Sequence, residues 1–179
     1  LKAGGWKTGG ELPEFSRFIL VLAPHTSNWD LFIYIAVSYA MGFKFNYFGK
    51  QVLFRKPHGL FFRGLGGIPV NRKNPENLVE DTVETMQSAE EMILLIAPEG
   101  TRSLTKYWKT GFYRIAYQAE IPIVLGYLDY KEKVGGIGPT LEPTGSIEED
   151  FKIIRKFYKK VSGRNPANMG KIRVRSSIN

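Results

Sequence analysis

Apolar runs alternate with helix-forming patterns along most of the chain. Residues 18–23, 92–97 and 121–128 are short, continuous and rich in branched side chains, as is typical of strands buried on both faces of a sheet. Between them lie segments with apolar residues at helical spacing. Strands that alternate with helices predict an α/β fold with a largely parallel or mixed central sheet flanked by helices.

The remaining elements follow from local signals. Ser27 with Asp30, and Ser146 with Glu149, read as capping boxes at the starts of two helices. We predict helices over residues 29–41, 110–120 and 146–162, and a further helix that begins at residue 74. Shorter strands are predicted near residue 6 and over residues 45–49 and 68–72. We also predict a hairpin within residues 131–145 and an edge strand over residues 171–175. No linker, repeat or low-complexity block interrupts the chain, so we expect a single domain over residues 1–179.

Two of the predicted core strands end alike. Residues 18–23 run through Ala23-Pro24 into His25, and residues 92–97 run through Ala97-Pro98 into Glu99. In open α/β sheets, ligands bind in the crevice outside the carboxyl ends of the strands. If the two strands are parallel neighbours, His25 and Glu99 face one crevice.

His25 lies in the loop before a helix, and Asp30 lies in the first turn of that helix. The chain can fold back so that the carboxylate meets an imidazole nitrogen, fixes the ring tautomer and stabilises the imidazolium. Capping alone would also explain Asp30. Arg72 follows a short strand, and Arg102 lies in the Glu99 loop. A base, carboxylates and guanidiniums together suit a substrate with a hydroxyl to deprotonate and a phosphate to hold. Arg72 could instead be a surface cation, and Glu99 could pair with Arg102 in a turn.

Composition narrows the chemistry. The sequence has no cysteine, which excludes disulfides, a thiol nucleophile and cysteine-ligated zinc, and two histidines argue against a histidine-rich metal site. The net charge of +8 attracts anions such as lipid headgroups, nucleic acid or an acidic carrier protein. Residues 51–67 alternate large apolar residues with cations, which suits a membrane interface, although the aromatics could equally fill the core. The longest uncharged stretch, residues 31–43, is too short to span a bilayer.

Four motifs, in order and at fitting spacing, resemble those of the glycerolipid acyltransferases, the group that contains 1-acylglycerol-3-phosphate acyltransferase. His25 and Asp30, separated by four residues, resemble the first motif. Residues 67–72 (GIPVNR) resemble the second motif, residues 98–103 (PEGTRS) the third, and residues 121–124 (IPIV) the fourth. The resemblance covers about residues 17–130 and is most specific in the third motif.

The resemblance implies a fold like that of glycerol-phosphate acyltransferase and an O-acyltransferase activity. His25 would deprotonate an acceptor hydroxyl, oriented by Asp30, and the oxygen would attack the thioester of an acyl-CoA or acyl-carrier protein. Arg72 and Arg102 would hold an acceptor phosphate, and the acceptor pocket would be shaped by Glu99, Gly100 and Thr101. The acceptor would be a lysophospholipid, with no resident metal or cofactor. We expect a cytoplasmic protein, peripheral on the cytoplasmic face of the membrane, with no nucleic-acid partner.

Two other functions compete with this one. The acceptor could be a lyso-ornithine lipid, a glycan or another lipid alcohol. Alternatively, the chain could be a non-catalytic basic module that binds anionic membrane or nucleic acid. That second alternative explains the net charge but leaves unexplained why His25 and Glu99 each follow an apolar strand and an Ala-Pro pair.

Overall fold

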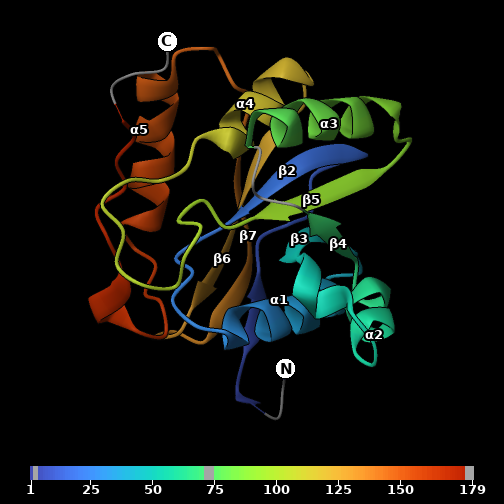
Figure 1. Cartoon of the computed structure of the whole chain (residues 1–179). Coiled ribbons are helices and arrows are strands. Elements are labelled where there is room, and N and C mark those ends of the chain that lie inside the picture. The colour runs from blue at the N-terminus through green and yellow to red at the C-terminus, as the bar shows by residue number, and fades with distance from the viewer. Residues whose placement is uncertain (2–3, 71–74, 176–179) are drawn as a thin grey trace.

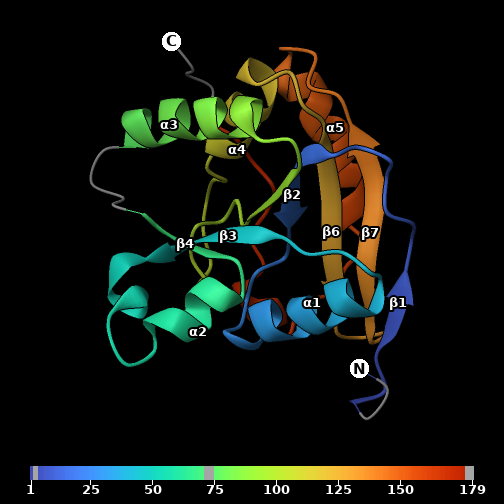
Figure 2. The ribbon, with the colours of Figure 1, turned by 90° about the vertical axis from the view of Figure 1, so that its right-hand side faces the viewer.

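The computed structural model describes residue 1 and residues 4–70 and 75–175. Its centre is a seven-stranded mixed sheet with the order β1-β7-β6-β2-β5-β3-β4 (Figures 1 and 2). Every pair of neighbouring strands is parallel except β6 and β7. These two form a hairpin whose first strand precedes residues 131–145, so the prediction of a hairpin within that segment was wrong in its bounds. The fold class predicted from the sequence is confirmed. The strands are β1 (Lys7–Gly9), β2 (Arg17–Leu22), β3 (Asn46–Lys50), β4 (Gly67–Val70), β5 (Met92–Ile96), β6 (Ile123–Asp129) and β7 (Val134–Leu141).

Helices cover both faces of the sheet. The α-helices are α1 (Trp29–Ala40), α2 (Gly59–Gly64), α3 (Pro75–Ser88), α4 (Gly111–Gln118) and α5 (Ile147–Tyr158), and the short 3-10 turns are η2 (Gln51–Phe54) and η3 (Pro166–Asn168). One core cluster joins α3, α4 and α5 to one face, and a second joins α1 to the other (Figure 1). No described helix has both the length and the apolar character needed to cross a membrane.

Strand β2 shows why the central runs are so apolar. Phe18, Leu20 and Leu22 pack into the cluster under α1, while Ile19 and Val21 pack into the cluster under α4 and α5. All five side chains are buried, because β2 lies between β6 and β5 in the middle of the sheet and has a helical layer on each side. The predicted two-sided burial is confirmed.

Three local predictions need correction. The Ser146 side chain makes no capping bond; instead Thr144 donates to Asp150 through its backbone N–H (2.8 Å) and its hydroxyl (3.0 Å). Asp150 is selected because Tyr113 of α4 also donates to it, at 2.6 Å. Helix α5 ends at Tyr158, earlier than predicted. Residues 171–175 form no strand, and their described contact with the main chain is the 2.8 Å bond from the Trp108 N–H to the Arg173 carbonyl.

Candidate active site

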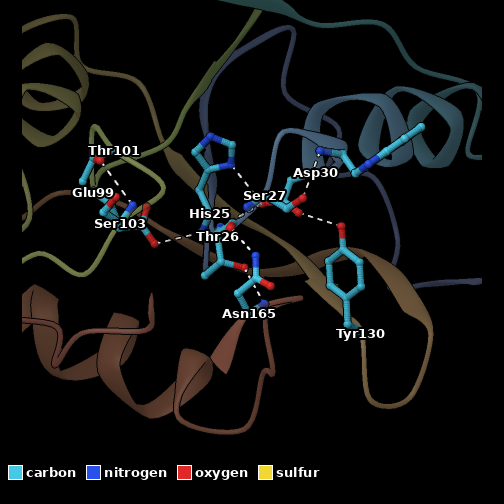
Figure 3. A network of polar contacts seen from close by, with 10 residues as sticks. His25, Thr26, Ser27, Asp30, Glu99, Thr101, Ser103, Tyr130 and Asn165 are labelled. Atoms are coloured by element: carbon cyan, nitrogen blue, oxygen red, sulfur yellow. Dashed lines mark hydrogen bonds and ion pairs between the residues drawn. The ribbon is translucent and has the colours of Figure 1, made fainter. Parts of the chain in front are cut away.

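The loops after β2 and β5 meet at the carboxyl edge of the sheet. The two strands pair in parallel, with Val21 beside Ile96, so the residues that follow them lie next to each other. The backbone N–H of His25 donates to Oε1 of Glu99 at 3.0 Å (Figure 3). The two loops that the sequence placed in one crevice are therefore joined directly.

Asp30 holds the His25 ring. Its Oδ2 atom lies 3.0 Å from His25 Nδ1 and also accepts the backbone N–H groups of Thr26 (2.8 Å) and Ser27 (2.9 Å) (Figure 3). The bond to Ser27 is half of the predicted capping box; in place of the other half, the Ser27 hydroxyl accepts from the Trp29 N–H at 3.2 Å. The carboxylate thus shapes the loop that carries His25 as well as the ring itself.

Tyr130 completes the environment of Asp30. It follows β6, which is parallel to β2 on the side away from β5, and its hydroxyl donates to Asp30 Oδ1 at 2.6 Å. Sequence reasoning missed this residue. The available signal was topological: Tyr130 follows a third core strand, and a parallel neighbour of β2 brings its last residues to the same edge.

Hydrogen bonds determine the charge of Asp30, which is only 1% exposed. Burial alone would raise its pKa, but the bonds from His25, Tyr130 and Ser27 outweigh this and hold the pKa below its usual value. The pKa of Tyr130 is raised by burial and by its bond to the carboxylate. An ionised Asp30 can only accept, so Nδ1 of His25 carries a proton and the lone pair of the neutral ring is on Nε2. Because 21% of the His25 side chain is exposed, the ring is open to a ligand.

A second set of contacts fixes the His25 loop from the side of α5. Asn165 donates its backbone N–H to the Thr26 hydroxyl (3.1 Å) and its side-chain amide to the Thr26 carbonyl (2.8 Å) (Figure 3). No local pattern in the sequence indicates this contact, because it joins residues 139 positions apart. The loop is held on both sides, which pre-organises the His25 ring.

Glu99 lies at the junction of two surface hollows. Burial raises its pKa, and its Oε2 atom is buried with no hydrogen-bond partner among the described residues. One hollow, of about 670 Å³, is also lined by Pro24, and the other, of about 450 Å³, by Thr105. Cations surround both: Arg155, Lys159, Lys171 and Arg173 line the first, and Lys106, Lys109 and Arg175 the second. An anionic ligand suits both hollows.

The other predicted site residues are exposed in the turn after β5 or lie outside the described residues. Gly100 and Thr101 are exposed in the turn after β5; Gly100 has a φ of 65°, which favours glycine, and the Thr101 hydroxyl accepts from the Ser103 N–H at 3.2 Å. Arg102 is exposed in the same turn. Arg72 lies outside the described residues. No group of three or more His, Cys, Asp or Glu residues within the described parts of the chain could hold a metal ion.

Comparison with known proteins identifies the family. A family model described as Acyltransferase matches residues 9–125, about two thirds of the chain. The chain belongs to the acyltransferase family. This is the family of the glycerolipid acyltransferases, such as 1-acylglycerol-3-phosphate acyltransferase, so the resemblance seen in the four motifs is confirmed. No curated protein matches the chain.

The matched region divides the site of this acyltransferase into two parts. His25, Asp30 and Glu99 lie inside residues 9–125, whereas Tyr130 and Asn165 lie after them. The residues that support the His25 loop from β6 and from the segment after α5 are therefore contributed by the part of the chain that the family match does not cover.

Proposed function

We propose that this acyltransferase moves a fatty acyl group from acyl-CoA or acyl-carrier protein to a hydroxyl of a lysophospholipid such as 1-acylglycerol-3-phosphate. The observation that carries the proposal is the His25–Asp30–Tyr130 arrangement beside the Glu99 turn. It is a histidine with a free Nε2 lone pair, an ionised carboxylate behind it, and solvent access in front.

The reaction is a direct transfer. Nε2 of His25 takes the proton of the acceptor hydroxyl as its oxygen attacks the thioester carbon, and Asp30 stabilises the imidazolium that forms. The tetrahedral intermediate collapses, the C–S bond breaks, and the imidazolium returns the proton to the leaving thiolate. An acyl-enzyme on cysteine is excluded because the chain has none, and the thioester supplies the activated acyl group without a resident cofactor.

We assign the cations and the Glu99 turn to substrate binding. Arg72 and Arg102 bind the acceptor phosphate, and the turn of Glu99, Gly100 and Thr101 shapes the acceptor pocket. The cation-lined hollows beside Glu99 suit the phosphates of CoA or the acidic face of a carrier protein. Since the acceptor is a lipid, we place the reaction at the cytoplasmic face of the membrane.

Thiol release from acyl-CoA in the presence of a lipid extract tests the proposal, with the new ester identified by mass spectrometry. General-base help is worth about 10²–10⁴ in rate, so His25→Ala should lose nearly all turnover. His58→Ala is the matched control, because His58 is the other histidine and lies exposed before α2. Wild-type rates in His25→Ala would remove the base from the mechanism, and a new ester on a phosphate-free acceptor would replace the proposed substrate.

A further inference from the structure

Four large apolar side chains of η2 and α2 point into solvent. Val52 is 61% exposed, Leu53 39%, Leu60 83% and Phe61 59%. We call these four residues the η2–α2 surface. Single exposed apolar residues are ordinary, but four on two short elements that contact each other are a feature of the kind that marks an interaction site.

Other side chains than these four provide the packing of this segment. Phe54 and Phe62, from the same segment, turn inward and contact each other with ring centroids 6.4 Å apart, and Arg63 lies over the Phe54 ring at 5.4 Å. The interpretation of residues 51–67 as packed aromatics therefore holds for Phe54 and Phe62, whereas the membrane-interface interpretation stays a prediction for the exposed side chains. Phe61 contacts the Phe62 ring, with centroids 5.5 Å apart, but stays largely exposed like Leu60, so both side chains can still contact a partner.

Charge is concentrated in the same part of the chain. Residues 31–75 contain seven Lys and Arg residues and no Asp or Glu, and thus account for seven of the eight net positive charges of the protein. These cations are Lys44, Lys50, Arg55, Lys56, Arg63, Arg72 and Lys73. Arg55 and Lys56 are exposed between η2 and α2, directly beside the apolar side chains. The partner of this surface is therefore both apolar and anionic.

The η2–α2 surface lies at the same end of the molecule as α1 (Figures 1 and 2). Helix α1 begins with Trp29, which is 58% exposed, contacts the Phe32 ring at 6.2 Å and has the Arg164 guanidinium at 5.8 Å from its ring. Trp29 is four residues after His25. Exposed aromatic side chains thus occur on both helices at this end, and the cation beside Trp29 is supplied by Arg164.

We infer that the η2–α2 surface inserts into the headgroup region of an anionic bilayer. Leu60 and Val52 suit acyl chains and cannot stack on nucleic-acid bases, while a second copy of the chain would bring like charges together. Cations beside the inserted side chains bind lipid phosphates. Membrane binding would bring a lipid acceptor to the end of the molecule where His25 lies; only this last consequence rests on the proposed function.

Flotation of the whole chain with vesicles tests the inference without any substrate, so its outcome is independent of the His25 experiment. The vesicles contain phosphatidylcholine with or without phosphatidylglycerol. We expect binding only with phosphatidylglycerol and weaker binding at high salt. The L60S/F61S variant should bind roughly tenfold less or weaker still. The affinity of the R55Q/K56Q variant for these vesicles should fall about fivefold for each cation removed.

Matched controls come from other faces of the molecule. Leu104 and Tyr117 are 63% and 52% exposed, so L104S/Y117S removes similar apolar area. K156Q/K160Q removes two exposed cations, one in the last turn of α5 and one just after the helix. Both control variants should bind as the wild type does. If L60S/F61S unfolds, L60S alone replaces it, because Leu60 is the most exposed of the four.

Several results would overturn the inference. These are absence of binding to phosphatidylglycerol vesicles, equal binding to neutral vesicles, or equal losses in the test and control variants. Light scattering that shows a dimer dissociated by L60S/F61S would assign the surface to a second copy instead. Oligonucleotide binding lost in R55Q/K56Q, with no vesicle binding, would assign it to nucleic acid.

Discussion

Asp30→Asn separates the charge of Asp30 from its shape. Oδ2 of Asp30 faces three N–H donors, from His25, Thr26 and Ser27, whereas Oδ1 faces the Tyr130 hydroxyl. In the variant, the amide oxygen takes the position with three donors, because an amide NH₂ there would oppose all of them. The NH₂ then faces the tyrosine oxygen, which can accept. The proton therefore stays on His25 Nδ1, and only the negative charge is lost.

The size of the effect follows from the separation of the groups. Opposite unit charges about 4 Å apart attract by about 4 kcal/mol at the effective dielectric near a protein surface. A neutral acceptor retains roughly half of a charge-assisted hydrogen bond. The imidazolium-like transition state thus loses about 2 kcal/mol, which corresponds to a roughly 30-fold fall in kcat. This is smaller than the loss of about 10²–10⁴ expected for His25→Ala, since the base remains.

The assay is thiol release at saturating acceptor, together with thermal unfolding. Asp150→Asn is the matched control: Asp150 is 2% exposed and accepts a tyrosine hydroxyl at 2.6 Å and a backbone N–H at 2.8 Å. Each variant should lose about 2 kcal/mol of stability, or roughly 4–8 °C in Tm, because a hydrogen bond to a charged group is weakened. Only Asp30→Asn should lose kcat. Equal kcat in the two variants, or wild-type kcat in Asp30→Asn, would refute the assignment of Asp30 to the imidazolium.

Three further predictions concern other residues assigned to the proposed site. Tyr130→Phe removes one donor from Asp30 but leaves its charge, so kcat should fall about threefold to tenfold with KM unchanged, the loss expected for a positioning residue and measurable in the same thiol-release assay. Burial raises the pKa of Glu99, so the free energy of unfolding of the wild type should fall as the pH rises from its ordinary value of 4.5 through the raised folded pKa. Glu99→Gln should abolish this fall and be the more stable protein at pH 7; identical pH profiles in denaturant titrations would contradict the prediction. Arg72→Ala should raise KM at least tenfold for a phosphorylated acceptor and leave KM for a phosphate-free alcohol unchanged, whereas a small change in the first would argue against a phosphate acceptor.

The sheet was predictable because its central strands are buried on both faces. Such strands carry no competing polar pattern, so residues 18–23, 92–97 and 121–128 were recognised from apolar runs alone. Ends of elements were less predictable, because tertiary contacts decide them. The acid bound at the start of α5 is Asp150 rather than Glu149, since Tyr113 of another helix reaches Asp150.

The site was predictable where its contacts are local and hidden where they are distant. His25 and Asp30 are five positions apart, and a capping pattern already placed the acid in the first turn. Glu99 was found because a parallel neighbour of β2 had the same Ala-Pro ending. Tyr130 and Asn165 are 100 and 139 positions from their partners, and no local pattern marks a hydroxyl or amide that acts over such separations.

Because of these contacts, the position of the His25 ring depends on three adjacent strands. The loop after β2 carries the ring, the loop after β5 binds its backbone through Glu99, and the residue after β6 binds its carboxylate partner through Tyr130. A shift of any one strand along the sheet would move a bond of about 3 Å out of range. Burial raises the pKa of the Glu99 carboxyl, and its Oε2 atom has no hydrogen-bond partner among the described residues, so ionising this group costs stability. A chain under no functional constraint would gain stability by replacing it, so its presence beside a partly exposed histidine favours a role in binding substrate over a role in the fold.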